Sequence, residues 1–170
     1  SRGLGDVYKR QPDGRALMCG IAGLFHPGTP KPVDPARIAA MIAAQAHRGP
    51  DGEGIWTAPG VGLGHRRLSI IDLEGSPQPM HAGALSVTYN GEIYNFAELR
   101  AQLERGGARF VTDGDTEVLL HGWRAWGPGL LDRLNGMFAF AIHDAEAGKL
   151  FLARDRLGVK PLHYVELSDG

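Results

Sequence analysis

MCGIAGLF, residues 18–25, places the only cysteine of the chain directly behind an internal methionine. A lone cysteine forms no disulfide within the chain, so Cys19 is either a small buried apolar side chain or a reactive thiol. If translation starts at Met18 and the methionine is then removed, Cys19 carries both a thiol and a free α-amine. Such an amine has a pKa of roughly 7.7 to 8, so it can take the thiol proton and return it to a leaving amine. The reactive reading is therefore a nucleophile that contains its own base.

The composition is that of an ordinary globular protein. The 170 residues suit one domain, and the hydrophobic content of 43%, the charged content of 22% and the formal net charge of -1 give no bias toward polyanions. No apolar run approaches the ~20 residues of a membrane span, and residues 1–17 lack the apolar stretch of a secretion signal. We therefore expect no nucleic-acid partner, no membrane association and a cytoplasmic location.

Three segments have the apolar spacing of helices. The first begins at an Asp34 cap and ends at Gly49, with Ile38, Met41 and Ile42 on one face. The second runs from an Asn95 cap to Gly106, and the third, TEVLLHGWRAWG, closes at Gly127. The strand-like runs are IAGLF, VGLGHRRLSII, ALSVTYN, MFAFAIHD and KLFLARD, and DAEAG separates the last two as a hairpin would. Strands before and after a helical middle predict sheets with helices on their outer faces.

NGEIYN, residues 90–95, offers two hydrogen-bond donors close together. The Asn90 side-chain amide and the Gly91 backbone N–H could form an oxyanion hole for amide hydrolysis. The alternative is an ordinary turn that joins a strand to a helix.

Charged residues nearby could hold an amino acid. Strand alternation sends Arg66 and Arg67 to opposite faces, so one could grip a carboxylate while the other is solvated; the alternative is an exposed basic pair. Asp115 is either a helix cap or a group that holds a substrate ammonium. With a thiol and an oxyanion hole, these residues would describe a pocket for an α-amino acid that has a reactive side-chain carbonyl.

Together, the motifs resemble the glutaminase domain of glutamine-hydrolysing asparagine synthetases, class II amidotransferases of the N-terminal-nucleophile hydrolase fold. The resemblance runs from Met18 to the end of the chain. It rests on ordered motifs at compatible spacing: MCGIAGLF, AHRGPDGEG, LGHRRLSIIDL, QPM, YNGEIYN, DTEVLL, LNGMFAFAIHD and LARDRLGVKPLHY. The implied fold is α+β, a four-layer αββα sandwich.

The resemblance also implies roles for single residues. Cys19 would attack the glutamine amide to form a thioester, with Asn90 and Gly91 as the oxyanion hole. The implied glutamine-binding residues are Arg67, Leu68, Ser69, Ile70, Ile71, Asn90, Gly91, Glu92 and Asp115. Among these, Arg67 would bind the substrate carboxylate, and Glu92 and Asp115 would hold the ammonium. No metal ligand is implied here, since the histidines show no i, i+4 pair and there is no second cysteine.

The chain departs from the family pattern at both ends. We interpret residues 1–17 as a leader, either an assembly artefact upstream of a start at Met18 or a propeptide that is removed. Residues 18–170 read as an amidotransferase domain that is incomplete at its C-terminus. The resemblance places ATP and Mg²⁺ in a synthetase domain that is absent from the sequence, normally joined in cis, and allows a homodimer in the full-length form.

Three other readings stay open. A synthetase-like enzyme could pass the ammonia to a carboxylate other than aspartate. A papain-like hydrolase could pair Cys19 with a histidine, which would give activity with the leader attached. A non-enzymatic fragment could bind glutamine or a partner without turnover.

Overall fold

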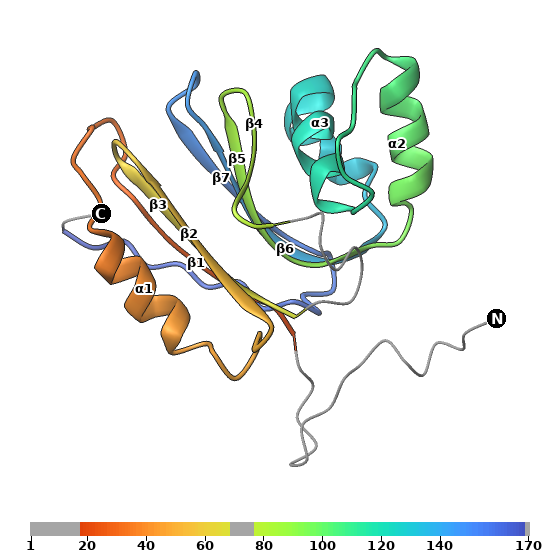
Figure 1. The fold of residues 1–170 in the computed structure, drawn as a ribbon. Helices are drawn as coiled ribbons and strands as arrows, with labels where there is room; N and C mark the ends of the chain where they lie inside the picture. Colours follow the sequence, from red (N-terminus) through yellow and green to blue (C-terminus); the bar gives the residue numbers. More distant parts are fainter. Residues whose placement is uncertain (1–17, 69–76, 169–170) are drawn as a thin grey trace.

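The computed structural model describes residues 18–68 and 77–168, and it places two antiparallel sheets face to face with helices on both outer sides (Figure 1). The first sheet has the strand order β1 (Gly20–Phe25), β3 (Val61–Arg67), β2 (Gly52–Ala58) and is covered by α1 (Pro35–Ala43). The second has the order β4 (Met80–Ala82), β5 (Leu85–Ile93), β6 (Gly136–Asp144), β7 (Lys149–Arg154) and is covered by α2 (Phe96–Arg105) and α3 (Thr116–Trp126), with a 3₁₀ helix at Gly127–Asp132. The predicted α+β fold, a four-layer αββα sandwich, is confirmed.

The outer helix α1 packs closely because β3 carries glycine beneath it. Asp34 caps the helix through its carboxylate, which accepts a backbone N–H at 2.9 Å. Ile38 and Ile42 are fully buried, and a Cβ at Gly64 would lie 2.6 Å from a methyl carbon of Ile42. Glycine at this position therefore sets the spacing between the first two layers.

The strand β6 is buried on both faces, as its apolar sequence predicts. Phe138, Phe140 and Ile142 belong to the core beneath α2 and α3, whereas Ala141 belongs to a smaller cluster between the two sheets. The predicted hairpin with β7 is also present, because β6 and β7 pair in antiparallel register. This strand thus joins the two cores of the sandwich.

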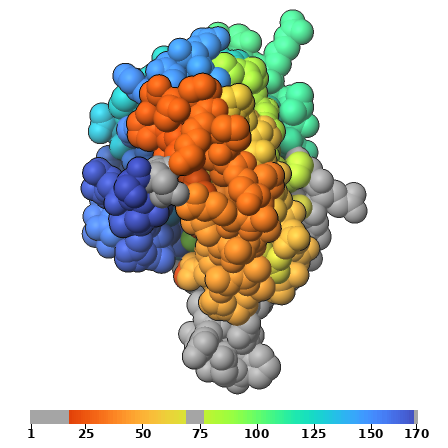
Figure 2. Space-filling model, turned by 90° about the vertical axis from the view of Figure 1, so that its left-hand side faces the viewer, coloured from red at the N-terminus to blue at the C-terminus, as the bar shows by residue number. Residues whose placement is uncertain are grey.

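After β7 the chain crosses from the second sheet to the first, and the last described residues lie beside α1 (Figure 1). Figure 2 shows these last residues, in dark blue, next to the orange surface of α1. The crossing lies near the end of the sandwich at which β1 begins, so it brings residues about 140 positions apart in sequence into contact, such as Lys160 and Met18.

Several local predictions were wrong. Met41 is 38% exposed rather than buried, and α1 ends at Ala43, with turns rather than helix leading to Gly49. Asn95 precedes α2 but makes no side-chain cap; its amide instead bonds the backbone of Arg133 and Asn135. The short strand β4 and the strand β2 have no counterpart among the predicted runs.

Candidate active site

Cys19 lies one residue before β1, against the end of β3. Its Sγ accepts a hydrogen bond from the Leu68 N–H at 3.3 Å and donates one to the Leu68 carbonyl at 3.6 Å. The Cys19 carbonyl accepts from Arg48 Nε at 3.3 Å, and the Met18 N–H donates to the Arg48 carbonyl at 3.0 Å. Backbone and side chain of the cysteine are therefore both fixed.

Charged groups from three parts of the chain lie near the thiol. Burial raises its pKa, the Leu68 N–H and the positive charges of Lys160 and Arg67 lower it, and the carboxylate of Asp115 raises it; the net direction is upward. A thiol with a raised pKa is protonated at neutral pH, so attack on a carbonyl carbon needs a base that removes the proton.

The two arginines of β3 point in opposite directions, as predicted. Residues 61 and 63 pack between the sheets, and strand alternation places Arg67 on that same inner face. Arg66 lies on the outer face, where Nε donates to the Gly49 carbonyl at 3.1 Å and the guanidinium forms an ion pair with Glu53. Arg66 is thus paired rather than solvated, so the prediction that the second arginine is solvated was wrong.

Asn90 and Gly91 lie inside β5 rather than in a turn, opposite Ala139 and Phe138 of β6. The turn interpretation is therefore wrong. Asn90 is 4% exposed. Two residues away on the same strand face, Thr88 Oγ1 donates to the Gly64 carbonyl of β3 at 3.0 Å. Alternation therefore directs the Asn90 side chain into the space between the sheets.

The backbone amides of β5 form a row along the edge that faces away from β6. On this edge the Tyr89 N–H donates to Gln78 Oε1 at 2.6 Å, and the Ile93 N–H donates to Asp115 Oδ2 at 2.9 Å. Backbone N–H groups alternate along an antiparallel strand, so the Gly91 N–H points to the same edge. Neither the Gln78 nor the Asp115 side chain bonds it, and it has no Cβ beside it.

Asp115 and Glu92 supply the acidic side of the site. Asp115 occupies the N-cap position of α3, but its side chain makes no cap hydrogen bond. Its Oδ2 instead accepts from the Tyr89 hydroxyl at 2.7 Å and from the Ile93 N–H, which joins the start of α3 to β5. Burial raises the pKa of Asp115, and these hydrogen bonds oppose the rise. Burial and the charge of Asp115 raise the pKa of Glu92, and Lys160 opposes this. Glu92 therefore lies near both.

The sequence of residues 18–170 matches the family model of the glutamine amidotransferase domain. The chain belongs to this family. The resemblance drawn from the motifs is confirmed at the level of the family.

Relatives of this amidotransferase domain are longer proteins. Asparagine synthetase [glutamine-hydrolyzing] 3 of Bacillus subtilis (strain 168) is 40% identical over 153 residues, which cover 88% of this chain and 25% of the relative. Asparagine synthetase B [glutamine-hydrolyzing] of Escherichia coli (strain K12) is 39% identical over 150 residues, covering 86% of this chain and 26% of the relative. The chain thus spans about a quarter of the length of these relatives.

A solved structure of similar fold is glutamine phosphoribosylpyrophosphate amidotransferase from B. subtilis, complexed with ADP and GMP. It superposes with a TM-score of 0.59 at 22% identity, over 82% of this chain and 37% of the other. At this identity the likeness bears on the fold alone, and it supports the arrangement of two sheets between helical layers.

The structure brings most of the predicted site residues of the amidotransferase domain together. These are Cys19, Arg67, Leu68, Asn90, Gly91, Glu92 and Asp115. Ser69, Ile70 and Ile71 lie outside the described residues. Sequence reasoning missed Lys160 and Tyr89 as neighbours of the thiol, although both stand in quoted motifs, LARDRLGVKPLHY and YNGEIYN.

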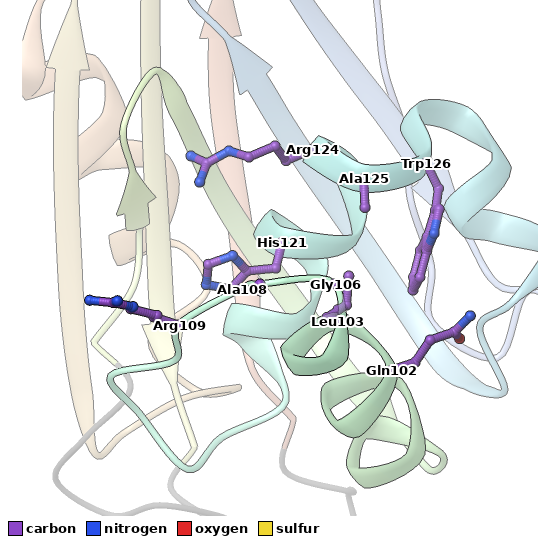
Figure 3. A pocket seen from close by; sticks show the side chains of 10 residues that line it. Gln102, Leu103, Gly106, Ala108, Arg109, His121, Arg124, Ala125 and Trp126 are labelled. Carbon is purple, nitrogen blue, oxygen red and sulfur yellow. The ribbon is translucent and has the colours of Figure 1, made fainter.

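A separate pocket of about 560 Å³ lies in the outer helical layer, between the C-terminal halves of α2 and α3 (Figure 3). It is lined by Gln102, Leu103, Gly106, Gly107, Ala108, Arg109, His121, Arg124, Ala125 and Trp126, none of which is a predicted glutamine ligand.

Within the described part of the chain, no three His, Cys, Asp or Glu side chains gather as a metal site requires. None of the helices in residues 18–68 and 77–168 has the length and apolar character needed to cross a membrane.

His65, beside Arg67 on β3, makes the stability of the domain depend on pH. It is 2% exposed, and burial, reinforced by the charge of Arg67, lowers its pKa to about 4. As the pH falls from about 6.5 to 4, the unfolded chain takes up a proton on this residue and the folded chain does not, which removes about 3 kcal/mol of stability. Urea unfolding at pH 7 and pH 4 should show a smaller loss for His65→Gln than for the unsubstituted chain.

The exposed His163 supplies a matched control for this measurement. His163→Gln should leave the pH dependence unchanged. An equal loss of stability in the unsubstituted chain and in His65→Gln would contradict a buried neutral His65.

Proposed function

We propose that this amidotransferase domain hydrolyses glutamine to glutamate and ammonia with Cys19 as the nucleophile. The observation that carries the proposal is the meeting, at one end of the sandwich, of the thiol with Arg67, the β5 edge and Asp115. The family membership favours glutamine as the substrate.

The chemistry follows from the groups at the site. The α-amine of a free Cys19 takes the thiol proton while Sγ attacks the side-chain amide carbon of glutamine. The negative oxygen that forms is held by the Asn90 side-chain amide and the Gly91 N–H. The C–N bond then breaks, the α-ammonium returns its proton to the leaving nitrogen, and ammonia departs from a thioester. Water, activated by the same amine, cleaves the thioester to glutamate and regenerates the thiol.

The charged residues orient the substrate. Arg67 forms a bidentate pair with the α-carboxylate of glutamine, because a guanidinium matches the geometry of a carboxylate. Asp115 and Glu92 hold the α-ammonium, and we include Leu68, Ser69, Ile70 and Ile71 among the glutamine-binding residues. The Asn90 side-chain amide is one of the two proposed oxyanion donors, so an Asn90→Ala variant is expected to lower kcat by about 10² to 10³.

The names of the relatives suggest what becomes of the ammonia. We propose that it serves the ATP-dependent conversion of aspartate to asparagine in a synthetase domain joined to this one. ATP and Mg²⁺ would act in that domain, and a cytoplasmic location would supply the ATP.

The test is covalent labelling together with turnover. A chain that begins at Cys19, obtained by expression from Met18 and removal of the methionine, is incubated with glutamine or with 6-diazo-5-oxo-L-norleucine, a glutamine analogue that alkylates such cysteines. We expect release of glutamate and an adduct on Cys19 by intact mass, and neither in Cys19→Ala. A folded chain that gives no glutamate and no adduct would contradict the proposal.

A further inference from the structure

Lys160 is a buried cation in the segment that follows β7. It is 4% exposed, which is uncommon for lysine unless a partner compensates the charge. Its Nζ lies 3.0 Å from the Met18 Sδ, so the ammonium sits beside the residue that precedes the nucleophile. Thioether sulfur is a weak acceptor, and it does not account for a buried charge at this place.

The carboxylate of Asp155 holds Lys160 in position. Its oxygens accept from the N–H groups of Phe138, Leu157, Val159 and Lys160 at 3.1, 3.1, 2.9 and 3.0 Å. Burial would raise the pKa of Asp155, but these four donors outweigh it and the pKa is lowered. A carboxylate that gathers four amides fixes the whole segment against β6.

A glycine completes this turn. Gly158 has φ +65°, a conformation that glycine adopts without strain, and its N–H donates to the Asp155 carbonyl at 3.0 Å. The segment therefore has one defined path, and that path brings the side chain of Lys160 to Met18, the residue before the nucleophile.

Three acidic groups lie near the Lys160 ammonium. Burial lowers the pKa of Lys160 and Arg48 lowers it further, whereas Cys19, Glu92 and Asp155 oppose this. Lys160 and Arg67 both lower the pKa of the thiol. The titratable and charged groups near Cys19 are Lys160, Arg67, Asp115 and Tyr89, and those near Lys160 are Cys19, Arg48, Glu92 and Asp155.

We propose that Lys160 is a positioning residue of this site: Asp155 fixes its backbone, and its buried ammonium stabilises the thiolate of Cys19 as it attacks. A positive charge beside the free α-amine also disfavours a second positive charge there, so the amine stays in its neutral, proton-accepting form. This inference rests on the proposed function for its role in turnover, but the electrostatic coupling can be measured on the thiol alone.

The experiment is the rate of Cys19 alkylation by iodoacetamide as a function of pH. Cys19 is the only cysteine, so the rate reports one thiol. The measurement is made on the 170-residue chain and on the chain that begins at Cys19. In Lys160→Met, the midpoint of the pH profile should rise by about one pH unit, with alkylation about tenfold slower below it, because an opposite charge that lowered the thiol pKa is gone. Lys160→Arg keeps the charge and should restore most of the rate.

Lys149→Met is the matched control, since Lys149 is an exposed lysine at the β6–β7 hairpin and its loss should leave the profile unchanged. An unshifted profile in a folded Lys160→Met variant would overturn the proposal. Should this variant not fold, the coupling is read in the unsubstituted chain: the Lys160 ¹³Cε resonance should titrate with Cys19, and blocking the thiol as its carbamidomethyl adduct should abolish that step. A Lys160 resonance that does not titrate with Cys19 would also overturn the proposal.

Glutamate release separates this proposal from the function. A shifted alkylation profile in a chain that releases no glutamate would support the role of Lys160 and contradict glutamine hydrolysis. An unshifted alkylation profile in a chain that releases glutamate would contradict the role of Lys160 and support glutamine hydrolysis.

Discussion

A chain whose first residue is Cys19 should hydrolyse glutamine at least about 10²-fold faster than the 170-residue chain with residues 1–18 attached. A positioned general base contributes about 10² to 10⁴ in rate, and the proposed base is the Cys19 nitrogen itself. In the longer chain that nitrogen belongs to a peptide bond and has no lone pair that accepts a proton. Initial rates of glutamate release, measured from pH 6 to pH 9 for both chains, check the expectation.

A chain with a single glycine before Cys19 is the matched control. The added residue is small, but it converts the Cys19 nitrogen into an amide and moves the free amine one residue away. We expect this chain to be as slow as the longer one, since the loss comes from the chemistry of the nitrogen and not from the bulk of a leader.

Equal rates in all three chains would favour the papain-like reading, in which a histidine is the base. The geometry does not favour it. The hydrogen bonds of the Cys19 Sγ are with the Leu68 backbone, and no histidine of the described residues bonds the sulfur.

The elements with strong local signals were predicted well. The cap of Asp34 and the apolar run of β6 depend on neighbouring residues, and both predictions are confirmed. Met41 was misplaced because the buried stripe of α1 is narrow: Ile38 and Ile42, one turn apart, fill the space above β3, and Met41 lies outside it. The periodicity of apolar residues shows which face of a helix is apolar, but it does not show how much of that face is buried against the sheet.

Tertiary pairing explains the errors at β5. Asn-Gly is a strong turn signal, and it suggested that the strand stops at Asn90. In the structure β6 offers a paired edge as far as Gly136, so β5 continues to Ile93. The strand β2, GEGIWTA, has glycine at two of its first three positions, which weakens any strand pattern.

The residues that the structure brings together around Cys19 are distant in sequence. Cys19, Arg67, Asp115 and Lys160 come from four distant parts of the sequence, and only the strand order brings them together. The resemblance named the first three because they stand in motifs with implied roles. Lys160 stands in a motif without one, and its burial is visible only once the Asp155 turn is built.

Gly91→Ala should be among the most disruptive single substitutions in the domain, because it removes space in the middle of the second sheet. A Cβ at Gly91 would overlap the Met137 carbonyl oxygen and would lie 2.7 Å from the Phe138 Cα and 2.9 Å from the Tyr89 ring. Two of these atoms are backbone of β6, so the conflict is relieved only if β5 and β6 separate. We expect a loss of at least about 3 kcal/mol in the free energy of unfolding, at the upper end for an overpacked site.

The same substitution should abolish glutamine hydrolysis, since any shift of β5 moves the Gly91 N–H away from the developing oxyanion. Asn90→Ala is the matched comparison. It removes the other proposed donor but adds no atom, so the losses should be mainly catalytic, with the rate reduced by about 10² to 10³. Urea unfolding and glutamate release, measured on both variants, separate the two effects. If Gly91→Ala unfolded at the same urea concentration as the unsubstituted chain and kept its kcat, neither the close pairing of β5 with β6 nor the oxyanion role of Gly91 could stand.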